Sequence, residues 1–332
     1  MELTWLDPCH LDSGDLDGAV ALLEAARVVD CPHQLGQTVS SYAALLRHGW
    51  DGDPPFAAVA RDGGGRRVVG VLELWLPRWD NTHAGSVEVT VDPAARRRGL
   101  GRQLFEAGVE RTRADGRRLV LSESWDAPAG VGFAKAMGLD RASEEVKRRQ
   151  DMLAVDWARL DDEYAAAENR ASGYELVRMP GATPDGMLAA VVAMTEAIND
   201  APTDDLDIED EVFSPERIRA FETAQDAYGR RTYRLVVRER ATGVLAGHTM
   251  VGVEVNRPWY GSQYDTSVLR SHRGHRLGFL LKIAMLRWLR DAEPQLRTLD
   301  TWNAASNTHM IRVNEVLGYD VVATAIDWQR HL

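Results

Sequence analysis

The chain has 332 residues, of which 45% are hydrophobic and 27% charged, and its formal net charge is −11. These values are ordinary for a folded globular protein and exclude a fibrous or disordered chain. The acidic balance argues against a broad nucleic-acid-binding face. No apolar run reaches the roughly 18 residues that a membrane helix needs, and the start MELTWLDPCHLD is unlike a signal peptide, so we expect a cytoplasmic protein. Two cysteines, Cys9 and Cys31, predict neither a disulfide framework nor a zinc site.

The length corresponds to roughly two domains of about 150 residues. In the first half, hydrophobic periodicity and turn residues predict a helix over 15–29, two strands within 56–76, a strand over 86–93, a helix over 100–115, a strand over 117–125 and a short helix before 137–139. In the second half they predict the same series: a helix over 183–198, two strands within 233–255, a strand over 263–270, a helix over 277–290, a strand over 296–302 and a helix before 317–319. The order of elements is therefore repeated.

Individual residues support the repeat. Gly70 matches Gly247 between the paired strands, and aligning Arg96 with Arg273 leaves Gly138 and Gly318 only three residues out of register. We therefore expect two copies of one domain, at 1–150 and 173–332, joined by a charged, Ala-rich linker at 151–172.

Each half has a loop that follows a strand and begins a helix. The first contains Arg96, Arg97, Arg98, Gly99, Leu100 and Gly101, and the second contains Arg273, Gly274, His275, Arg276, Leu277 and Gly278. Glycines in such a loop let the backbone approach a ligand, and the helix N-terminus presents unpaired N–H groups to an anion. The arginines add charged donors. Since neither the P-loop nor the dinucleotide-binding pattern is present, we predict a different kind of pyrophosphate site.

This arrangement resembles the acetyl-CoA pyrophosphate loop of the GNAT superfamily, the Gcn5-related N-acetyltransferases. Within that superfamily the chain looks like the tandem actinobacterial type, to which mycothiol synthase also belongs. The resemblance implies an α/β fold with a mixed sheet splayed between its fourth and fifth strands, and acetyl-CoA as cosubstrate without a metal. It also implies that Val89 and Val91, and Thr266 and Val268, lie along the pantetheine arm.

A second GNAT element, an Asn after the fifth strand and a Tyr on the following helix, is only partly present. Asn307 occupies the Asn position and is a candidate cofactor ligand, whereas Asn314 stands where the Tyr is usual. The corresponding residues in the first half are Ala127 and Ala134. The second element therefore matches the GNAT pattern more closely in the C-terminal half. The pyrophosphate loop matches that pattern more closely in the N-terminal half.

Acyl transfer to an amine requires the amine to lose a proton. Glu88 and Asp265 are the candidate bases, because both lie eight residues before the first arginine of a loop and alternate with the apolar strand residues. The alternative is that both are polar residues on a solvated sheet face.

An acidic run follows the first helix of the C-terminal half and contains Asp204, Asp205, Asp207, Glu209, Asp210 and Glu211. In the fold that the resemblance implies, this segment borders the acceptor pocket and would attract a cationic amine. A solvated acidic loop is the alternative interpretation.

The sequence thus predicts an acetyl-CoA-dependent N-acetyltransferase that acts on a primary amine of a small metabolite, with its chemistry in the C-terminal half. A non-catalytic acyl-CoA sensor or scaffold is the main alternative, because the Tyr is absent from both halves. Acylation of a protein or carrier remains open. We expect no nucleic-acid or membrane partner, and a monomer or homodimer.

Overall fold

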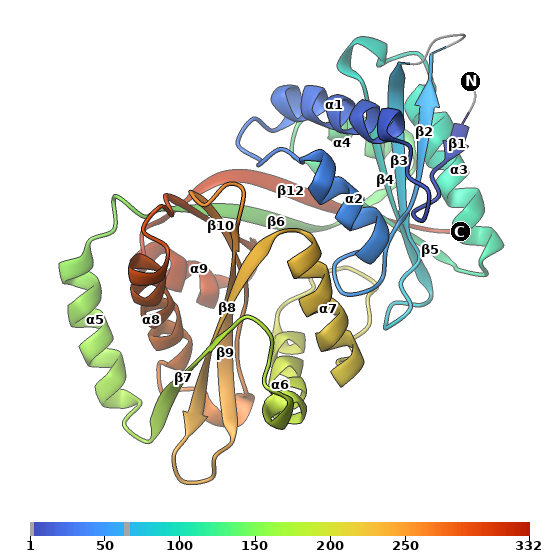
Figure 1. The fold of residues 1–332 in the computed structure, drawn as a ribbon. Coiled ribbons are helices and arrows are strands. Elements are labelled where there is room, and N and C mark those ends of the chain that lie inside the picture. Colours follow the sequence, from blue (N-terminus) through green and yellow to red (C-terminus); the bar gives the residue numbers. More distant parts are fainter. Residues whose placement is uncertain (1–2, 63–66) are drawn as a thin grey trace. The chain divides into compact units, whose positions relative to one another are not determined.

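The computed structural model describes residues 3–62 and 67–332 (Figure 1). The chain forms two compact units, which we describe separately. The first unit contains Met1–Glu145, Thr203–Asp210 and Ala323–Leu332, and the second contains Val146–Pro202 and Glu211–Val322. Both units consist of a mixed β-sheet with helices on its two faces, as the sequence predicts.

The first unit is built around a sheet in the order β1-β2-β3-β4-β5-β12. Its elements are β1 (Leu3–Trp5), α1 (Ser13–Asp30), α2 (Val39–His48), β2 (Phe56–Arg61), β3 (Val68–Trp75), β4 (Ala84–Val91), the 3₁₀ turn η1 (Pro93–Ala95), α3 (Leu100–Ala114), β5 (Leu119–Trp125), α4 (Pro128–Ala136), the start of β6 (Asp140–Asp151) and most of β12 (Tyr319–His331). Most neighbouring strands are antiparallel, but β4 and β5 are parallel.

Strand alternation separates the two faces of this sheet. Val59 and Val71 point toward α1 and α2, where Tyr42 is completely buried. Val87 and Leu72 point the other way, toward α3. Both α1 and α2 begin at capped residues: the Asp12 side chain accepts two backbone N–H groups, and Thr38 forms a capping box with Ser41.

The second unit repeats the plan with the strand order β6-β11-β10-β9-β8-β7. Its elements are the end of β6, α5 (Trp157–Arg170), β7 (Tyr174–Pro180), η2 (Asp185–Met187), α6 (Leu188–Thr195), η3 (Glu196–Asp200), α7 (Pro215–Ala227), β8 (Arg230–Glu239), β9 (Leu245–Glu254), β10 (Tyr260–Val268), η4 (Arg270–His272), α8 (Leu277–Ala292), β11 (Thr298–Ala304), α9 (Thr308–Val316) and the start of β12. Helix α8 is largely buried, with Leu281, Ile283 and Leu289 fully enclosed.

The predicted repeat is visible in the strand register. Gly70 lies opposite Val91, and Gly247 lies opposite Val268, so each glycine faces the last residue of β4 or β10. A Cβ at Gly70 would come within 2.7 Å of the Leu104 side chain, and one at Gly247 within 2.5 Å of the Ser267 carbonyl oxygen. Space for a side chain is therefore short at the same place in both units, but the obstacle is the end of the flexible Leu104 side chain at Gly70 and the backbone of Ser267 at Gly247.

Three segments differ from the contiguous division that the sequence suggests, and one of them is Thr203–Asp210, which belongs to the first unit. The stretch 151–172 contains the helix α5, which packs on α8 within the second unit. The last ten residues, Ala323–Leu332, belong to the first unit, where β12 pairs with β5 from Ala325↔Trp125 to His331↔Leu119. Ile326 and Trp328 are 1% and 2% exposed there and complete the apolar core.

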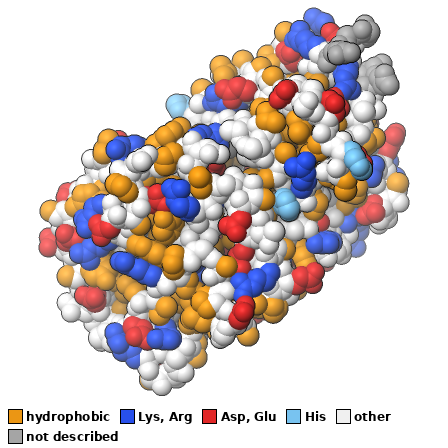
Figure 2. Space-filling view, viewed as in Figure 1, with side chains coloured by type: hydrophobic (Ala, Val, Ile, Leu, Met, Phe, Trp, Pro, Cys, Tyr) orange, Lys and Arg blue, Asp and Glu red, His pale blue; other side chains and the backbone are white. Residues whose placement is uncertain are grey.

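None of the helices in the described part of the chain is long and apolar enough to cross a membrane. On the face drawn in Figure 2, basic and acidic side chains of described residues are interspersed. That face shows no broad basic patch of the kind that binds nucleic acid.

Because Trp328 fills the core of the first unit, we expect Trp328→Ala to lower the free energy of unfolding by about 3–5 kcal/mol. Hydrogen exchange should accelerate in peptides of β5 and α4. Val321→Ala is the matched control on the same strand, because Val321 is 59% exposed and lies in the second unit. Equal exchange rates in β5 for wild type and Trp328→Ala would contradict this role of β12.

Candidate functional site

The two strand-to-helix loops have the same backbone conformation. In the first loop, φ is 64° at Arg97 and 83° at Gly99, and in the second it is 88° at Gly274 and 58° at Arg276. The second and fourth residues of each loop therefore adopt positive φ. The glycine is the fourth residue in the first loop and the second residue in the second loop. A non-glycine residue in this region costs of the order of 1 kcal/mol. Both loops keep the conformation despite that cost.

Each loop ends at a helix N-terminus with unpaired N–H groups. The Gln103 N–H donates to the Gly99 carbonyl over 3.2 Å, and the Leu280 N–H donates to the Arg276 carbonyl over 3.0 Å. The N–H groups that precede Gln103 and Leu280 in these first turns have no carbonyl of the same helix to bind. Together with the positive end of the helix dipole they suit a pyrophosphate. The residues present therefore fit the cosubstrate that the resemblance implies.

The first arginine of each loop is used internally. Arg96 Nε donates to the Val91 carbonyl at 3.1 Å, and its guanidinium binds Asp30 at 2.8 Å. Arg273 Nε likewise donates to the Val268 carbonyl at 3.1 Å, and its guanidinium binds Asp200 at 2.7 Å. The hydrogen bond that Arg96 donates to Asp30 raises the pKa of Arg96. Both arginines thus fix the loop to the end of its strand.

The remaining charges differ between the loops. Arg97 and Arg98 are exposed. Arg98 donates a hydrogen bond of 3.3 Å to the Ala94 carbonyl. In the second loop, Arg276 forms an ion pair with Glu163 at 3.0 Å, and His275 packs against Tyr174 with ring centres 5.5 Å apart. The first loop therefore offers more uncompensated positive charge to a phosphate.

The fourth and fifth strands of each unit separate, as the resemblance predicts. Parallel pairing of β4 with β5 runs from Ala84↔Leu119 only to Ser86↔Leu121, although both strands continue. In the second unit, β10 pairs with β11 only as far as Ser262↔Asp300. Val89 and Val91, predicted beside the cofactor arm, lie beyond the separation with side chains packed on the α3 core. Thr266 and Val268 lie beyond it in β10.

The places where the strands separate differ between the two units. In the first unit, the Ser122 hydroxyl donates to the Val87 carbonyl at 2.8 Å, and the Glu123 N–H donates to Glu88 Oε1 at 2.7 Å, so side chains bridge the strands where they part. In the second unit, the pairing of β10 with β9 shifts register between Gln263 and Thr266. This bulge contains Asp265, whereas β4 pairs regularly with β3 through Glu88.

The two predicted bases therefore sit in different surroundings. Burial, followed by the charge of Glu123, raises the pKa of Glu88 well above its usual value. Burial also raises the pKa of Asp265, but the positive charges of Arg234 and Arg217 oppose the rise. Only Glu88 has further carboxylates around it.

Those carboxylates form a row that sequence reasoning missed. Glu73 lies directly opposite Glu88 in the β3–β4 register, and Asp327 lies directly opposite Glu123 in the β12–β5 register. Glu145 of β6 lies close enough that the charge of Asp327 raises its pKa. We call Glu73, Glu88, Glu123, Asp327 and Glu145 the carboxylate row.

Loss of hydration is the first cause of the raised pKa values in the row. It raises the pKa of Glu73, Glu123 and Glu145 to about 7 in each case, although Glu123 is partly exposed. Burial also raises the pKa of Asp327, which a hydrogen bond from the Ser143 hydroxyl at 2.9 Å partly offsets.

Part of the acidic run joins the first unit. The Asp205 N–H donates to the Ala142 carbonyl at 3.1 Å, and Gln329 bonds to both the Asp205 carbonyl and the Asp207 N–H. The charge of Asp204 raises the pKa of Glu145. Glu211 lies in the second unit instead, where its N–H donates to Asn199 Oδ1.

The second GNAT element is occupied by a buried polar network. Asn307 caps α9, because its Oδ1 accepts the Met310 N–H at 3.1 Å. Asn314, at the usual Tyr position, is completely buried, and its Oδ1 accepts a hydrogen bond from Lys282 Nζ at 2.7 Å. Burial lowers the pKa of Lys282 to about 7. In the sequence, this network is indicated by Lys282, a lysine among the apolar residues of α8.

A second polar cluster lies in the sheet of the second unit. His248 is completely buried and Arg234 is 3% exposed, and His248 stands opposite Ser267 in the β9–β10 register. Both ring nitrogens of His248, Arg234 Nη1 and Ser267 Oγ have no hydrogen-bond partner among the described residues. Burial and the charge of Arg234 lower the pKa of His248 to about 3, so the ring is neutral.

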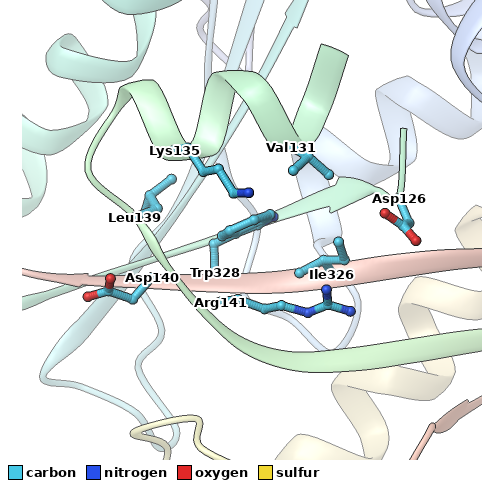
Figure 3. Close-up of a pocket in the computed structure, with 8 residues that line it drawn as sticks. All are labelled: Asp126, Val131, Lys135, Leu139, Asp140, Arg141, Ile326 and Trp328. Carbon is cyan, nitrogen blue, oxygen red and sulfur yellow. The ribbon is translucent and has the colours of Figure 1, made fainter. Parts of the chain in front are cut away.

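A pocket of about 270 Å³ lies elsewhere in the first unit, between α4 and β12. Figure 3 shows the indole of Trp328 at its centre, between Lys135 and Arg141. The Trp328 Nε1–H donates to Ser124 Oγ at 2.9 Å. None of the predicted site residues lines this pocket, whose walls are Asp126, Val131, Lys135, Leu139, Asp140, Arg141, Ile326 and Trp328. No group of three or more potential metal ligands with suitable geometry is found among the described residues.

Comparison with known proteins gives a family match for the part of the chain that contains the first loop. Residues 25–139 match the model of the acetyltransferase (GNAT) family. The chain is 38% identical over 106 residues to a mycothiol acetyltransferase of Clavibacter sepedonicus, a match that covers 32% of this chain and 28% of that protein. It is 35% identical over 133 residues to the mycothiol acetyltransferase of Clavibacter michiganensis subsp. michiganensis, covering 40% and 35%. The matches span about a third of the length of these curated relatives.

Solved structures match over nearly the whole chain. A tandem GNAT protein from the clavulanic acid biosynthesis pathway superposes with a TM-score of 0.81 at 29% identity, covering 99% of this chain and 98% of that one. A GCN5-related N-acetyltransferase from Sphaerobacter thermophilus gives a TM-score of 0.69 at 16% identity, covering 99% and 95%, which shows a shared fold. The expected tandem GNAT fold is confirmed.

The raised pKa of Glu73 predicts a pH-dependent stability. Its pKa is about 7 in the folded protein and about 4.5 in the unfolded chain, so its stabilising contribution is present below pH 4.5 and is lost as the pH rises through 7. Glu73→Gln removes this dependence. Relative to wild type, the variant should gain up to about 3 kcal/mol in free energy of unfolding between pH 4.5 and pH 8. Denaturant titrations at both pH values measure this gain, and a constant difference between the two proteins would contradict it.

Proposed function

We propose that this protein, which carries a GNAT acetyltransferase-family domain at residues 25–139 and has the fold of a tandem GNAT protein, transfers an acetyl group from acetyl-CoA to a primary amine of a small metabolite. We further propose that the first unit carries the chemistry. The sequence favoured the C-terminal half because of Asn307. The observation that favours the first unit is the position of Glu88, at the point where β4 and β5 part and ahead of a loop with exposed arginines.

The first loop would hold the cosubstrate. Arg97 and Arg98 would bind the pyrophosphate together with the N–H groups of the α3 N-terminus. Arg96 would act through the loop conformation, since its guanidinium is already bound to Asp30. Acetyl-CoA supplies the acetyl group as a thioester, which only a neutral amine attacks. A thiol with a pKa of about 8.5 is a fair leaving group, so no dedicated acid is required.

Glu88 would accept the proton of the amine. An amine is mostly protonated at neutral pH, and a carboxylate with a raised pKa is a stronger base than an ordinary one. The hydrogen bond from the Glu123 N–H fixes one oxygen of Glu88 and leaves the other for the amine. Asp265 would be the corresponding residue of the second unit, where two arginines favour its ionised form.

A second candidate function is non-catalytic binding of acyl-CoA. The observation that favours it is the absence of the usual Tyr: Ala134 and Asn314 occupy its positions, and both are buried. Turnover assays separate the two functions, because a sensor would bind acetyl-CoA and release no CoA with any amine.

Charge reversal in the first loop tests the location of the cosubstrate. We expect Arg97→Glu with Arg98→Glu to raise the Kd of acetyl-CoA at the first unit by at least about a hundredfold, because two charge-assisted contacts are lost. Calorimetric titration measures the affinity. Arg113→Glu, at the exposed far end of α3, is the matched control. Unchanged binding in the double variant would place the cosubstrate in the second loop.

Replacing Glu88 by Gln tests the base. Glu88→Gln keeps an oxygen that can accept the Glu123 N–H but cannot take up a proton, so we expect kcat to fall by about 10²–10⁴-fold with the affinity for acetyl-CoA unchanged. Asp265→Asn is the parallel change in the second unit. A large loss of kcat in Asp265→Asn with little loss in Glu88→Gln would move the chemistry to the second unit.

A further inference from the structure

The carboxylate row crosses five neighbouring strands of one sheet face. The strands β3, β4, β5, β12 and β6 lie next to one another in this order, and each provides one member of the row. The members in the same order are Glu73, Glu88, Glu123, Asp327 and Glu145. Paired neighbouring strands are about 4.8 Å apart, whereas β4 and β5 have already separated where Glu88 and Glu123 lie. Glu73 shares its face with Val71, which packs toward α2, so the row lies opposite the face that carries α3.

No cation within the described residues neutralises the row. None of its five members forms an ion pair with a described lysine, arginine or histidine. Like charges directly opposite one another in a sheet are destabilising, and two such pairs, Glu73 with Glu88 and Asp327 with Glu123, are present. The donors that act on the row are the Glu123 N–H, the Ser143 hydroxyl and the Tyr42 hydroxyl, which lowers the pKa of Glu73, and all three are uncharged.

Glu73 provides further evidence that the row lacks a cationic partner, because the group that lowers its pKa is the uncharged Tyr42 hydroxyl. Its side chain is only 9% exposed, and Oε1 has no hydrogen-bond partner among the described residues. This oxygen belongs to the residue directly opposite Glu88, at the end of the row. A buried carboxylate oxygen without a donor loses its hydration without replacement, which costs several kcal/mol unless a ligand or a proton compensates.

The segment 203–210 adds negative charge next to the other end of the row. It belongs to the first unit and contains Asp204, whose charge acts on both Asp327 and Glu145. It also places Asp207 and Glu209 near His83, whose Nε2 lies 3.0 Å from the Asp207 carbonyl oxygen. Segments from three parts of the sequence thus combine into one negative surface.

We propose that the carboxylate row binds a linear amine that carries two or more positive charges. The amine lies across the strands, with its first nitrogen between Glu73 and Glu88 and its further nitrogens following along the row toward Asp327. Three or four methylene groups between nitrogens suit the strand spacing, whereas a single ammonium group would leave most of the row unpaired. The assignment of this amine as the acetyl acceptor rests on the proposed function, because the nitrogen at Glu88 is the one to be acetylated.

Binding to the full-length protein tests the row directly. By calorimetry, spermidine should bind at least about tenfold more tightly than butylamine, since the latter has one charge. Glu145→Gln with Asp327→Asn should weaken spermidine binding at least about tenfold and leave butylamine binding unchanged. The Asn side chain can still accept the Ser143 hydroxyl, which protects the fold. Glu110→Gln, exposed on α3, is the matched control and should bind like wild type.

Steady-state kinetics separate this inference from the proposed function. In the double variant, KM for spermidine should rise by the same factor as Kd, while kcat stays within about threefold because Glu88 is intact. Selective spermidine binding without acetylation of any amine would retain the row and refute the acetyltransferase assignment to the first unit. Equal affinities for spermidine and butylamine in wild type, or unchanged spermidine affinity in the double variant, would overturn the inference.

Discussion

The rest of the first unit depends on how short the parallel contact between β4 and β5 is. Three residue pairs hold the strands together, and beyond Ser86↔Leu121 the backbone groups that face the gap need other partners. The Ser122 hydroxyl and the Glu88 carboxylate satisfy two of them. The separation therefore brings a carboxylate to the point where the strands part, and the end of β4 leads into the loop at 96–101, so that one constraint positions both parts of the candidate site.

The two units share the same strand plan and loop conformation, while their side chains differ. The loops exchange glycine and arginine between their two positive-φ positions, and the first arginine of each keeps the same carbonyl and an aspartate partner. The polar interiors differ in sign, because the first unit has the carboxylate row and the second has Arg234 beside His248. Such a difference is what two related domains with different ligands would show, since backbone anion sites tolerate side-chain change better than acceptor sites do.

Local pattern was enough to predict the loops, their helices and the glycines. Gly70 and Gly247 could be matched from the local sequence pattern, and in both places a neighbouring atom leaves little space for a Cβ: the Leu104 side chain beside Gly70 and the Ser267 carbonyl beside Gly247. Glu88 and Asp265 could be chosen as candidate bases because they hold the same repeat position and alternate with apolar strand residues. The carboxylate row could not be predicted, since its members are spread from residue 73 to residue 327 and meet through strand order alone. Lys282 was also not predicted, because helical periodicity places it in an apolar core without showing that Asn314 Oδ1 accepts its hydrogen bond.

The place of β12 also bears on how the protein is made. A ribosome releases the chain from its N-terminus, and domains generally fold in that order. Here β5 acquires its outer neighbour only when residues 325–331 have been synthesised, about two hundred residues after β5 itself. Until then β5 presents an unpaired edge and the apolar core lacks Ile326 and Trp328, which is a typical target for chaperones. The first unit is therefore the first to begin folding and the last to finish.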